Sequence, residues 1–269
     1  MNSPRPWRPG ALLWGSALLH VAALAGVALA PAAWPWALGA VILNHGLITA
    51  VGLWPRSTWL GPNRIRLPAT AAARRQIAIT IDDGPDPAVT PAVLDVLEAH
   101  GARATFFCIG TRARAHPALI AEIVRRGHEL GNHSEHHRHH FSLLGPAALT
   151  REIGAAQATL HALGGRAPAF FRAPAGLRNP FLEPVLARLG LHLASWTRRG
   201  FDTRETNADT ILARLTRHLA AGDILLLHDG HAARCAATGE PVILAVLPRL
   251  LARCDAAGLT PVTLSQAIG

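Results

Sequence analysis

From residue 76 to the C-terminus, short apolar runs alternate with longer amphipathic stretches. This alternation predicts strands at 76–81, 104–109, 169–172, 191–196, 223–228 and 259–262, and helices at 90–100, 116–126, 146–163, 179–189, 207–221 and 241–257. Glycine follows several of these helices closely, as is typical of C-terminal caps. The segment is therefore restricted to a mainly parallel sheet or barrel, with functional side chains at the carboxyl ends of its strands.

Two apolar runs precede this segment, at residues 11–30 and about 36–54. Each is long enough to cross a bilayer as a helix, and the prolines of the sequence PAAWPW between them break the helix. The runs predict a transmembrane hairpin that forms a membrane anchor in residues 1–60. The alternatives are a cleaved signal peptide, indicated by an A-x-A pattern at 28–30, and a buried hairpin of a soluble protein.

The anchor is followed by a basic linker at 61–75 and by a predicted catalytic domain at 76–269. The formal net charge is +9, and residues 1–75 supply seven of these charges, all from arginine. The body of the chain is thus close to neutral, which argues against nucleic acid as a partner. We expect the membrane to be a bacterial inner membrane. Arginines flank both apolar runs and the loop between them has no charge, so the positive-inside rule predicts that the catalytic domain lies on the cytoplasmic face. Three cysteines fit a reducing compartment.

Two adjacent carboxylates, Asp82 and Asp83, directly follow the first predicted strand. Neighbouring side chains in a strand point to opposite faces, so one carboxylate can bind a metal while the other faces a substrate. The sequence DDGP is also good turn chemistry, and a polar turn is the alternative.

Five histidines lie within residues 133–140, a composition typical of metal sites. His133 and His137 are four residues apart, so a helical turn would bring both imidazoles to one ion. His136 is an alternative to His137, because a three-residue spacing also meets on one face. His139 and His140 are interpreted as surplus histidines of a solvated loop.

Two further polar residues stand at predicted strand ends. Arg172, followed by Pro174 and Gly176, can hold a carboxylate while the turn presents backbone N–H groups to an anion. His228 ends the apolar strand at 223–228, where a lone histidine is usually structural.

Taken together, these residues resemble the polysaccharide deacetylase family, also described as the NodB-homology domain or carbohydrate esterase family 4. Four family motifs occur in order: residues 80–85 resemble TFDDGP, 133–137 resemble H-[S/T]-x-x-H, 172–176 resemble R-x-P-[YF]-G, and 226–228 resemble L-x-H. The resemblance covers about residue 76 to the C-terminus.

The resemblance implies a distorted (β/α) barrel and the metal-dependent removal of an N-acyl group, acetyl above all, from an amino sugar. Its implied metal ligands are Asp83, His133 and His137, which would hold zinc or another divalent transition metal. Its implied catalytic residues are Asp82 as general base, Arg172 holding Asp82, His228 as the acid for the leaving amine and Asp202 tuning that histidine. The implied oxyanion and substrate pocket contains the Ala175 N–H, Leu226 and Trp196.

Two departures from the family pattern concern the substrate pocket. Ala175 replaces an aromatic residue and Thr203 stands where tryptophan is expected, so we expect a wider site. A cytoplasmic domain on a membrane anchor favours a lipid-linked saccharide or another membrane-proximal glycan, whereas an exported domain would favour cell-wall polymer. The alternative function is a catalytically inactive sugar- or metal-binding protein that keeps the fold.

Overall fold

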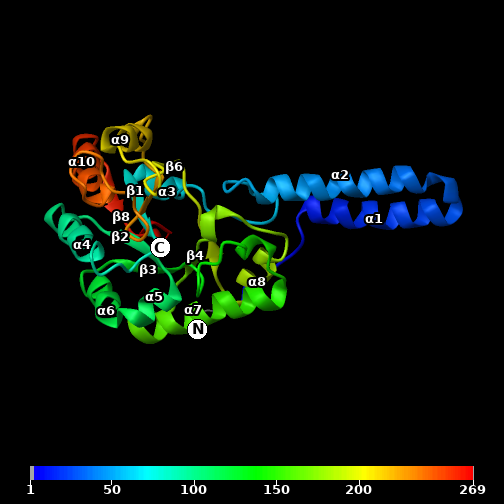
Figure 1. Ribbon diagram of the computed structural model, residues 1–269, viewed down its shortest axis with the longest axis horizontal. Coiled ribbons are helices and arrows are strands. Elements are labelled where there is room, and N and C mark those ends of the chain that lie inside the picture. Colours follow the sequence, from blue (N-terminus) through cyan, green and yellow to red (C-terminus); the bar gives the residue numbers. More distant parts are fainter. Residues whose placement is uncertain (1–2, 269) are drawn as a thin grey trace.

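The computed structural model describes residues 3–268, so Met1, Asn2 and Gly269, at the outer ends of the predicted anchor and catalytic domain, lie outside the described residues. Two apolar helices, α1 (Ala11–Leu29) and α2 (Trp34–Gly52), run side by side and project from the rest of the molecule (Figure 1). Both are long and apolar enough to cross a membrane. Most of their side chains are exposed, which contradicts the alternative of a hairpin buried in a soluble core.

The polar side chains of the hairpin face each other between the two helices. The Asn44 side-chain amide donates a hydrogen bond to the Ser16 hydroxyl at 2.8 Å. The Nε2 atoms of His20 and His45 lie 3.2 Å apart. Polar contacts of this kind stabilise helix pairs in an apolar surrounding, where the same groups would otherwise lack partners.

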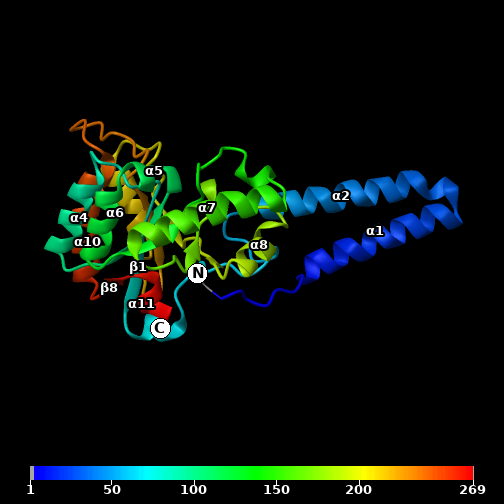
Figure 2. The ribbon, with the colours of Figure 1, turned by 90° about the horizontal axis from the view of Figure 1, so that it is seen from below.

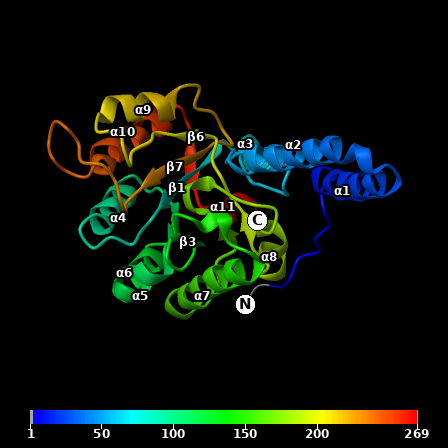
Figure 3. The same ribbon diagram turned by 45° about the vertical axis from the view of Figure 1, so that its right-hand side comes forward.

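The body of the molecule is built on an eight-stranded sheet in which all strand pairs are parallel, in the order β5-β4-β3-β2-β1-β7-β6 with β8 also paired to β1. The sheet curves into a distorted half-barrel surrounded by helices (Figures 1 and 3). This confirms the predicted fold class. The strands are β1 (Gln76–Asp82), β2 (Ala104–Cys108), β3 (Glu129–Asn132), β4 (Phe170–Phe171), β5 (His192–Leu193), β6 (Arg198–Arg199), β7 (Ile224–His228) and β8 (Thr260–Val262).

The α-helices of the body match the six amphipathic stretches, with ends that differ by a few residues. They are α4 (Thr90–Ala99), α6 (Pro117–Arg125), α7 (Pro146–Gly164), α8 (Leu182–Arg188), α9 (Ala208–Thr216) and α10 (Val242–Ala256). The sequence patterns missed three short helices, α3 (Ala69–Ala73), α5 (Gly110–Ala115) and α11 (Leu264–Ile268), and two strands, β3 and β6. β3 contains a glutamate, a glycine and an asparagine, and β6 is a pair of arginines, so neither has an apolar run.

Alternation along β1 divides its side chains between two environments. Ile77, Ile79 and Ile81 pack into the apolar cluster beneath the helical layer. Thr80 and Asp82 point into the barrel, where both accept hydrogen bonds from the same Arg172 nitrogen. The strand therefore anchors itself with one face and presents its last carboxylate inside the barrel with the other.

The segment after α2 packs along β5 instead of extending freely. The Arg64 N–H donates to the Leu193 carbonyl, and the Ser195 N–H donates to the Arg64 carbonyl, both at 2.9 Å. At the other end of the hairpin, Arg5 forms a 3.0 Å ion pair with Glu183 of α8. Both ends of the hairpin are thus tied to the side of the body that carries α8 (Figure 2).

Candidate active site

A cavity of about 390 Å³ opens at the carboxyl ends of β1 and β7. Its lining brings together most of the site residues predicted from the sequence: Asp82, Asp83, His133, His137, Ala175, Trp196, Leu226 and His228. These residues come from strand ends and loops that are far apart in the chain and meet only because the strands are parallel. Arg172 and Asp202 lie directly behind the cavity wall, in contact with Asp82 and His228 respectively.

Three side chains form a candidate metal centre. One ligand atom each from Asp83, His133 and His137 lies within 4.8 Å of the other two. Asp83 Oδ1 is 3.3 Å from His133 Nε2 and 3.2 Å from His137 Nε2. This buried oxygen accepts no hydrogen bond within residues 3–268, as expected of an atom that needs a cation. Two imidazoles and one carboxylate are a suitable ligand set for a divalent transition metal, so the residues fit the metal that the motifs imply.

The charge states of Asp83 and His137 also suit a metal. Burial raises the pKa of Asp83, but the nearby imidazoles of His133 and His231 outweigh it and hold that pKa well below its usual range. Burial and the neighbouring His133 lower the pKa of His137 to about 4. At neutral pH the carboxylate is therefore ionised and His137 is neutral, which are the forms that coordinate a cation.

The His133–His137 loop is not helical, so the predicted helical turn was wrong. Ser134 and His137 have φ values of 65° and 50°, and these left-handed residues fold the loop back so that the two imidazole centroids lie 4.8 Å apart. The His133 Nδ1 lies 2.8 Å from the Arg172 carbonyl, which leaves Nε2 facing the site. A four-residue spacing thus brings the rings together by a bend instead of a helix.

The other histidines of the cluster separate into different roles. His136 Nδ1 lies 3.0 Å from the Glu152 carboxylate on α7, away from the ligand group. The structure therefore places His137, and not His136, beside His133. His139 and His140 are exposed and lie outside the ligand group, as expected of a solvated loop, although His139 also lines the cavity.

Asp82 is held by a fully buried arginine. Arg172 Nη1 donates to Asp82 Oδ1 at 2.7 Å and to the Thr80 hydroxyl at 2.8 Å. Its Nε and Nη2 donate to the carbonyls of Ala194 and Ser195. With its donors fixed on both sides, the guanidinium has one orientation, and it fixes the carboxylate of Asp82 in turn.

His228 forms a dyad with Asp202. The Asp202 carboxylate accepts a hydrogen bond from the His228 backbone N–H at 2.7 Å and lies 2.8 Å from its Nδ1. Burial disfavours the charged imidazole, but the Asp202 carboxylate outweighs this and raises the pKa of His228. The ring is therefore oriented with Nε2 toward the cavity and supplied with a counter-charge, as an acid for a leaving group requires.

The far wall of the cavity contains the residues of the third motif. Ala175 lies in a turn, Pro174–Gly176, with φ 54°. Trp196 and Leu226 line the same cavity, with Thr203 at its rim. The Ala175 backbone N–H, in the same cavity as the metal group, is a donor of the kind that an oxyanion needs.

Sequence reasoning missed two groups that contact Asp83. His231 Nδ1 lies 3.2 Å from Asp83 Oδ2, and Arg112 of α5 donates to the Asp83 carbonyl at 3.0 Å. His231 follows the strand-end histidine by three residues in the sequence HDGH, a signal that the sequence contains. Arg112 had no such signal, because α5 was not predicted.

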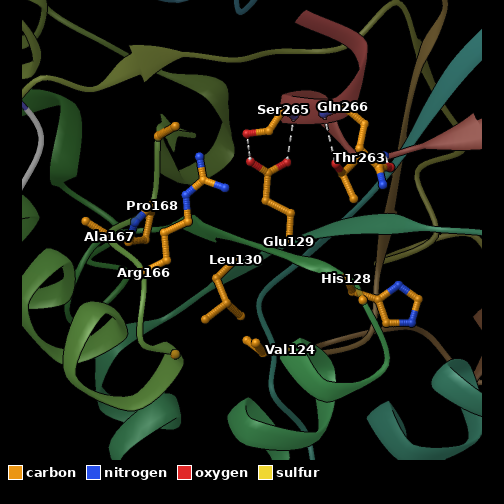
Figure 4. A pocket seen from close by; sticks show the side chains of 13 residues that line it. Val124, His128, Glu129, Leu130, Arg166, Ala167, Pro168, Thr263, Ser265 and Gln266 are labelled. Atoms are coloured by element: carbon orange, nitrogen blue, oxygen red, sulfur yellow. Dashed lines mark hydrogen bonds between the residues drawn. The ribbon is translucent and has the colours of Figure 1, made fainter. Parts of the chain in front are cut away.

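A second cavity, of about 300 Å³, lies at the amino-terminal end of β3. Figure 4 shows that its carboxylate, Glu129, is bonded to Ser265 of α11. Its histidine, His128, accepts the Ala104 N–H through Nδ1. Both side chains form hydrogen bonds that link parts of the fold, and no metal-ligand cluster occurs there among residues 3–268. The chemistry is therefore assigned to the cavity at the carboxyl ends.

The fold and the site define a class: a parallel α/β barrel hydrolase with an Asp–His–His metal centre at its strand ends. Comparisons with known proteins agree with this class. The family model described as Polysaccharide deacetylase matches residues 69–194. A peptidoglycan-N-acetylglucosamine deacetylase of Bacillus cereus is 34% identical over 183 residues, which are 64% of this chain and 77% of that protein. A chitooligosaccharide deacetylase of a Bradyrhizobium species is 36% identical over 158 residues, 58% of this chain and 72% of the relative.

The solved structures show the same likeness. A family 4 carbohydrate esterase from Streptomyces lividans, in complex with acetate, aligns with a TM-score of 0.62 and 32% identity over 69% of this chain and 91% of that one. The chain therefore belongs to the polysaccharide deacetylase family. Residues 11–52, which contain the apolar hairpin, lie outside the range of the family model.

Proposed function

We propose that this chain removes the N-acyl group, acetyl above all, from an amino sugar of a glycan or lipid-linked saccharide. Family membership makes it a carbohydrate N-deacetylase with a metal site at Asp83, His133 and His137. The observation that carries the proposal is the arrangement of three units around one cavity: the metal group, the Asp82–Arg172 pair and the Asp202–His228 dyad.

A divalent cation, zinc by its two-histidine and one-carboxylate ligand set, would supply the Lewis acid that polarises an amide carbonyl and acidifies water. Asp82 takes the proton of the attacking water, since Arg172 holds its carboxylate toward the cavity. The Ala175 N–H donates to the oxyanion that forms on the former carbonyl oxygen. His228 donates a proton to the amine as the C–N bond breaks, and Asp202 stabilises the charged ring before the transfer.

A chelator experiment tests the reaction class. We expect the purified full-length chain to release acetate from chitooligosaccharides, with formate release from N-formyl amino sugars measured in parallel. Chelation should abolish the release, and zinc should restore it. Stoichiometric bound metal with no release from any N-acyl amino sugar would instead indicate a binding protein that keeps the deacetylase fold.

We further propose that α1 and α2, within an anchor of residues 1–60, hold the catalytic domain of residues 76–269 at the bacterial inner membrane. Arg5 and Arg8 precede α1, and Arg56 follows α2, while the turn between the helices has no charge. The positive-inside rule then places the catalytic domain on the cytoplasmic face. Within the cytoplasm the accessible glycans are precursors, among them lipid-linked saccharides, and not finished wall polymer.

Proteolysis of membrane vesicles tests this orientation. The catalytic domain should be digested in inverted inner-membrane vesicles and protected in right-side-out vesicles. The opposite pattern would place the domain outside the cytoplasm and make wall polymer the substrate. If the cell instead cleaves off the first 30 residues and the rest of the chain leaves the membrane, this segment is a signal peptide.

A further inference from the structure

A groove of about 600 Å³, separate from the cavity at β3, adjoins the active-site cavity on the side of the hairpin. Its charged side chains are all arginines: Arg56, Arg198, Arg199, Arg214 and Arg217. Five cations without an acid on one lining surface make a local positive field that attracts anions.

Two of the five arginines are engaged by carboxylates. Arg198 pairs with the buried Asp223 at 2.6 Å, and Arg214 pairs with Glu205 at 3.1 Å. The other three, Arg56, Arg199 and Arg217, have no carboxylate partner in the described part of the chain. They leave a surplus of positive charge in the groove that no side chain neutralises.

Arg199 has the most specific environment of the three. Its guanidinium lies over the rings of Trp196 and Phe201, 5.5 Å and 5.0 Å from their centroids. Its Nε is buried and has no hydrogen-bond partner among residues 3–268. An unpaired buried donor on an oriented guanidinium is costly unless a ligand accepts from it, and phosphate oxygens match the geometry of that donor fork.

The groove is continuous with the catalytic cavity. Trp196, Arg199 and Phe201 line both of them, and Arg204, also without a carboxylate partner in the described chain, stands at the cavity rim. An anion in the groove would therefore lie next to a sugar whose N-acyl group is at the metal centre.

The other end of the groove reaches the hairpin. Trp54 and Pro55, which follow α2 after Leu53, line it, and the Arg56 guanidinium donates to the Thr197 carbonyl at 3.3 Å. Pro55 also contacts the Gly176 turn of the active site, where an added Cβ would lie 2.7 Å from the proline ring. Figure 3 shows β6 on the same side of the barrel as the end of α2. Trp54 is 56% exposed, as suits a residue at a membrane interface.

We propose that the groove binds the phosphate or diphosphate of an amino-sugar phosphoester, carried by a membrane lipid. This inference rests on the proposed deacetylase function and narrows its substrate to one class. The anion lies on Arg56, Arg199 and Arg217, the attached sugar enters the cavity, and the lipid remains in the bilayer that holds α1 and α2. The groove thus runs from the C-terminal end of α2 toward the metal centre, along a surface whose charged groups are all cationic.

The test compares three substrates with full-length protein in phosphatidylcholine nanodiscs. They are uncharged N-acetylchitotetraose, water-soluble N-acetylglucosamine 1-phosphate, and N-acetylglucosaminyl diphosphate on a short polyprenol. The variant is Arg56→Gln/Arg217→Gln, which leaves every residue of the catalytic cavity unchanged, and the matched control is Arg151→Gln on the exposed face of α7.

We expect the double variant to lower kcat/KM for both phosphate substrates by about tenfold or more for each arginine. Turnover of N-acetylchitotetraose should stay within about twofold of the parent, and Arg151→Gln should match the parent on every substrate. A kcat/KM at least about tenfold higher for the polyprenyl substrate than for the soluble phosphate would indicate that the natural substrate is carried by a lipid. Equal values for those two would overturn the lipid source.

Calorimetry with inorganic pyrophosphate in the presence of chelator adds a readout that is independent of turnover. Binding to the parent that is at least about tenfold weaker in the double variant supports the groove. Equal binding, or an equal loss of activity on charged and uncharged substrates, overturns it. Absence of release from all three substrates would count against the proposed function instead, because pyrophosphate binding would still report on the groove.

Discussion

Replacing Asp202 by asparagine should disable the acid of the reaction without disturbing the fold. Asparagine has the same shape, and its carbonyl oxygen can still accept the His228 backbone N–H, now bonded at 2.7 Å. What it removes is the negative charge whose oxygen lies 2.8 Å from His228 Nδ1. Two unit charges about 4 Å apart interact by ~4 kcal/mol at an effective dielectric constant of about 20.

That energy stabilises the charged imidazole that protonates the leaving amine. Since about 1.4 kcal/mol is a factor of ten in rate, its loss predicts a fall of about 10³-fold in kcat/KM at neutral pH. The sign of the pH effect also follows. Burial opposes the charge on His228 and Asp202 raises its pKa, so the asparagine variant lowers that pKa and confines the protonated, active form to more acidic solution.

The assay is the initial rate of acetate release between pH 5 and 9, together with metal content and thermal unfolding. Asp209→Asn is the matched control, because Asp209 makes an exposed ion pair with Arg249 far from the cavity. Metal content and unfolding should match the parent in both variants. An Asp202→Asn enzyme within about fivefold of the parent, with an unchanged pH profile, would refute the dyad as the proton source.

Four further predictions concern the metal, the base and stability. His133→Ala should lose the bound metal, measured by mass spectrometry, whereas His136→Ala should keep it. Loss of the metal from His136→Ala would instead make His136 a metal ligand. Asp82→Asn should keep the metal and lose most turnover, and full activity would remove Asp82 as the base. Arg172→Met should lower the free energy of unfolding by about 3–5 kcal/mol, because it leaves a buried carboxylate unpaired; adding Asp82→Asn should recover part of that loss, and no recovery would contradict the pairing. Burial, with nearby arginines, lowers the pKa of His128 from 6.5 to about 4. The folded state therefore favours neutral His128, and the free energy of unfolding should fall by about 2 kcal/mol between pH 6.5 and pH 5 as this histidine is protonated on unfolding. In denaturant unfolding, the free energy of unfolding of His128→Gln should fall less with acid than that of the parent.

Local patterns identified most of the scaffold before any packing was known. Strands β1, β2 and β7 are buried at every position but the first residue of β1, and their mostly apolar composition is what parallel strands with two covered faces require. The apolar hairpin was equally clear, because length and hydropathy define such helices without reference to any partner. β3 and β6 were missed because their residues become strands only through pairing with neighbours.

The site residues were found for a related reason. Parallel strands bring their carboxyl ends to one edge, so Asp82, Asp83 and His228 could be grouped from their positions at strand ends. His133 was found from the histidine-rich composition of residues 133–140. The sequence left two choices open, between His136 and His137 and between a helical and a bent loop. Tertiary contacts decided both, because Glu152 on α7 engages His136 and the left-handed Ser134 turns His137 inward.

By itself, then, the sequence determined the apolar hairpin, the alternating barrel and the residues able to hold a metal, since each depends on periodicity or on position relative to a strand. Only the tertiary structure decided which groups meet across distant segments. It placed His231 on Asp83, left the Arg199 Nε buried without a partner, and packed the segment after α2 along β5. No local pattern specifies such contacts, because they depend on how β5, β6 and the hairpin pack together.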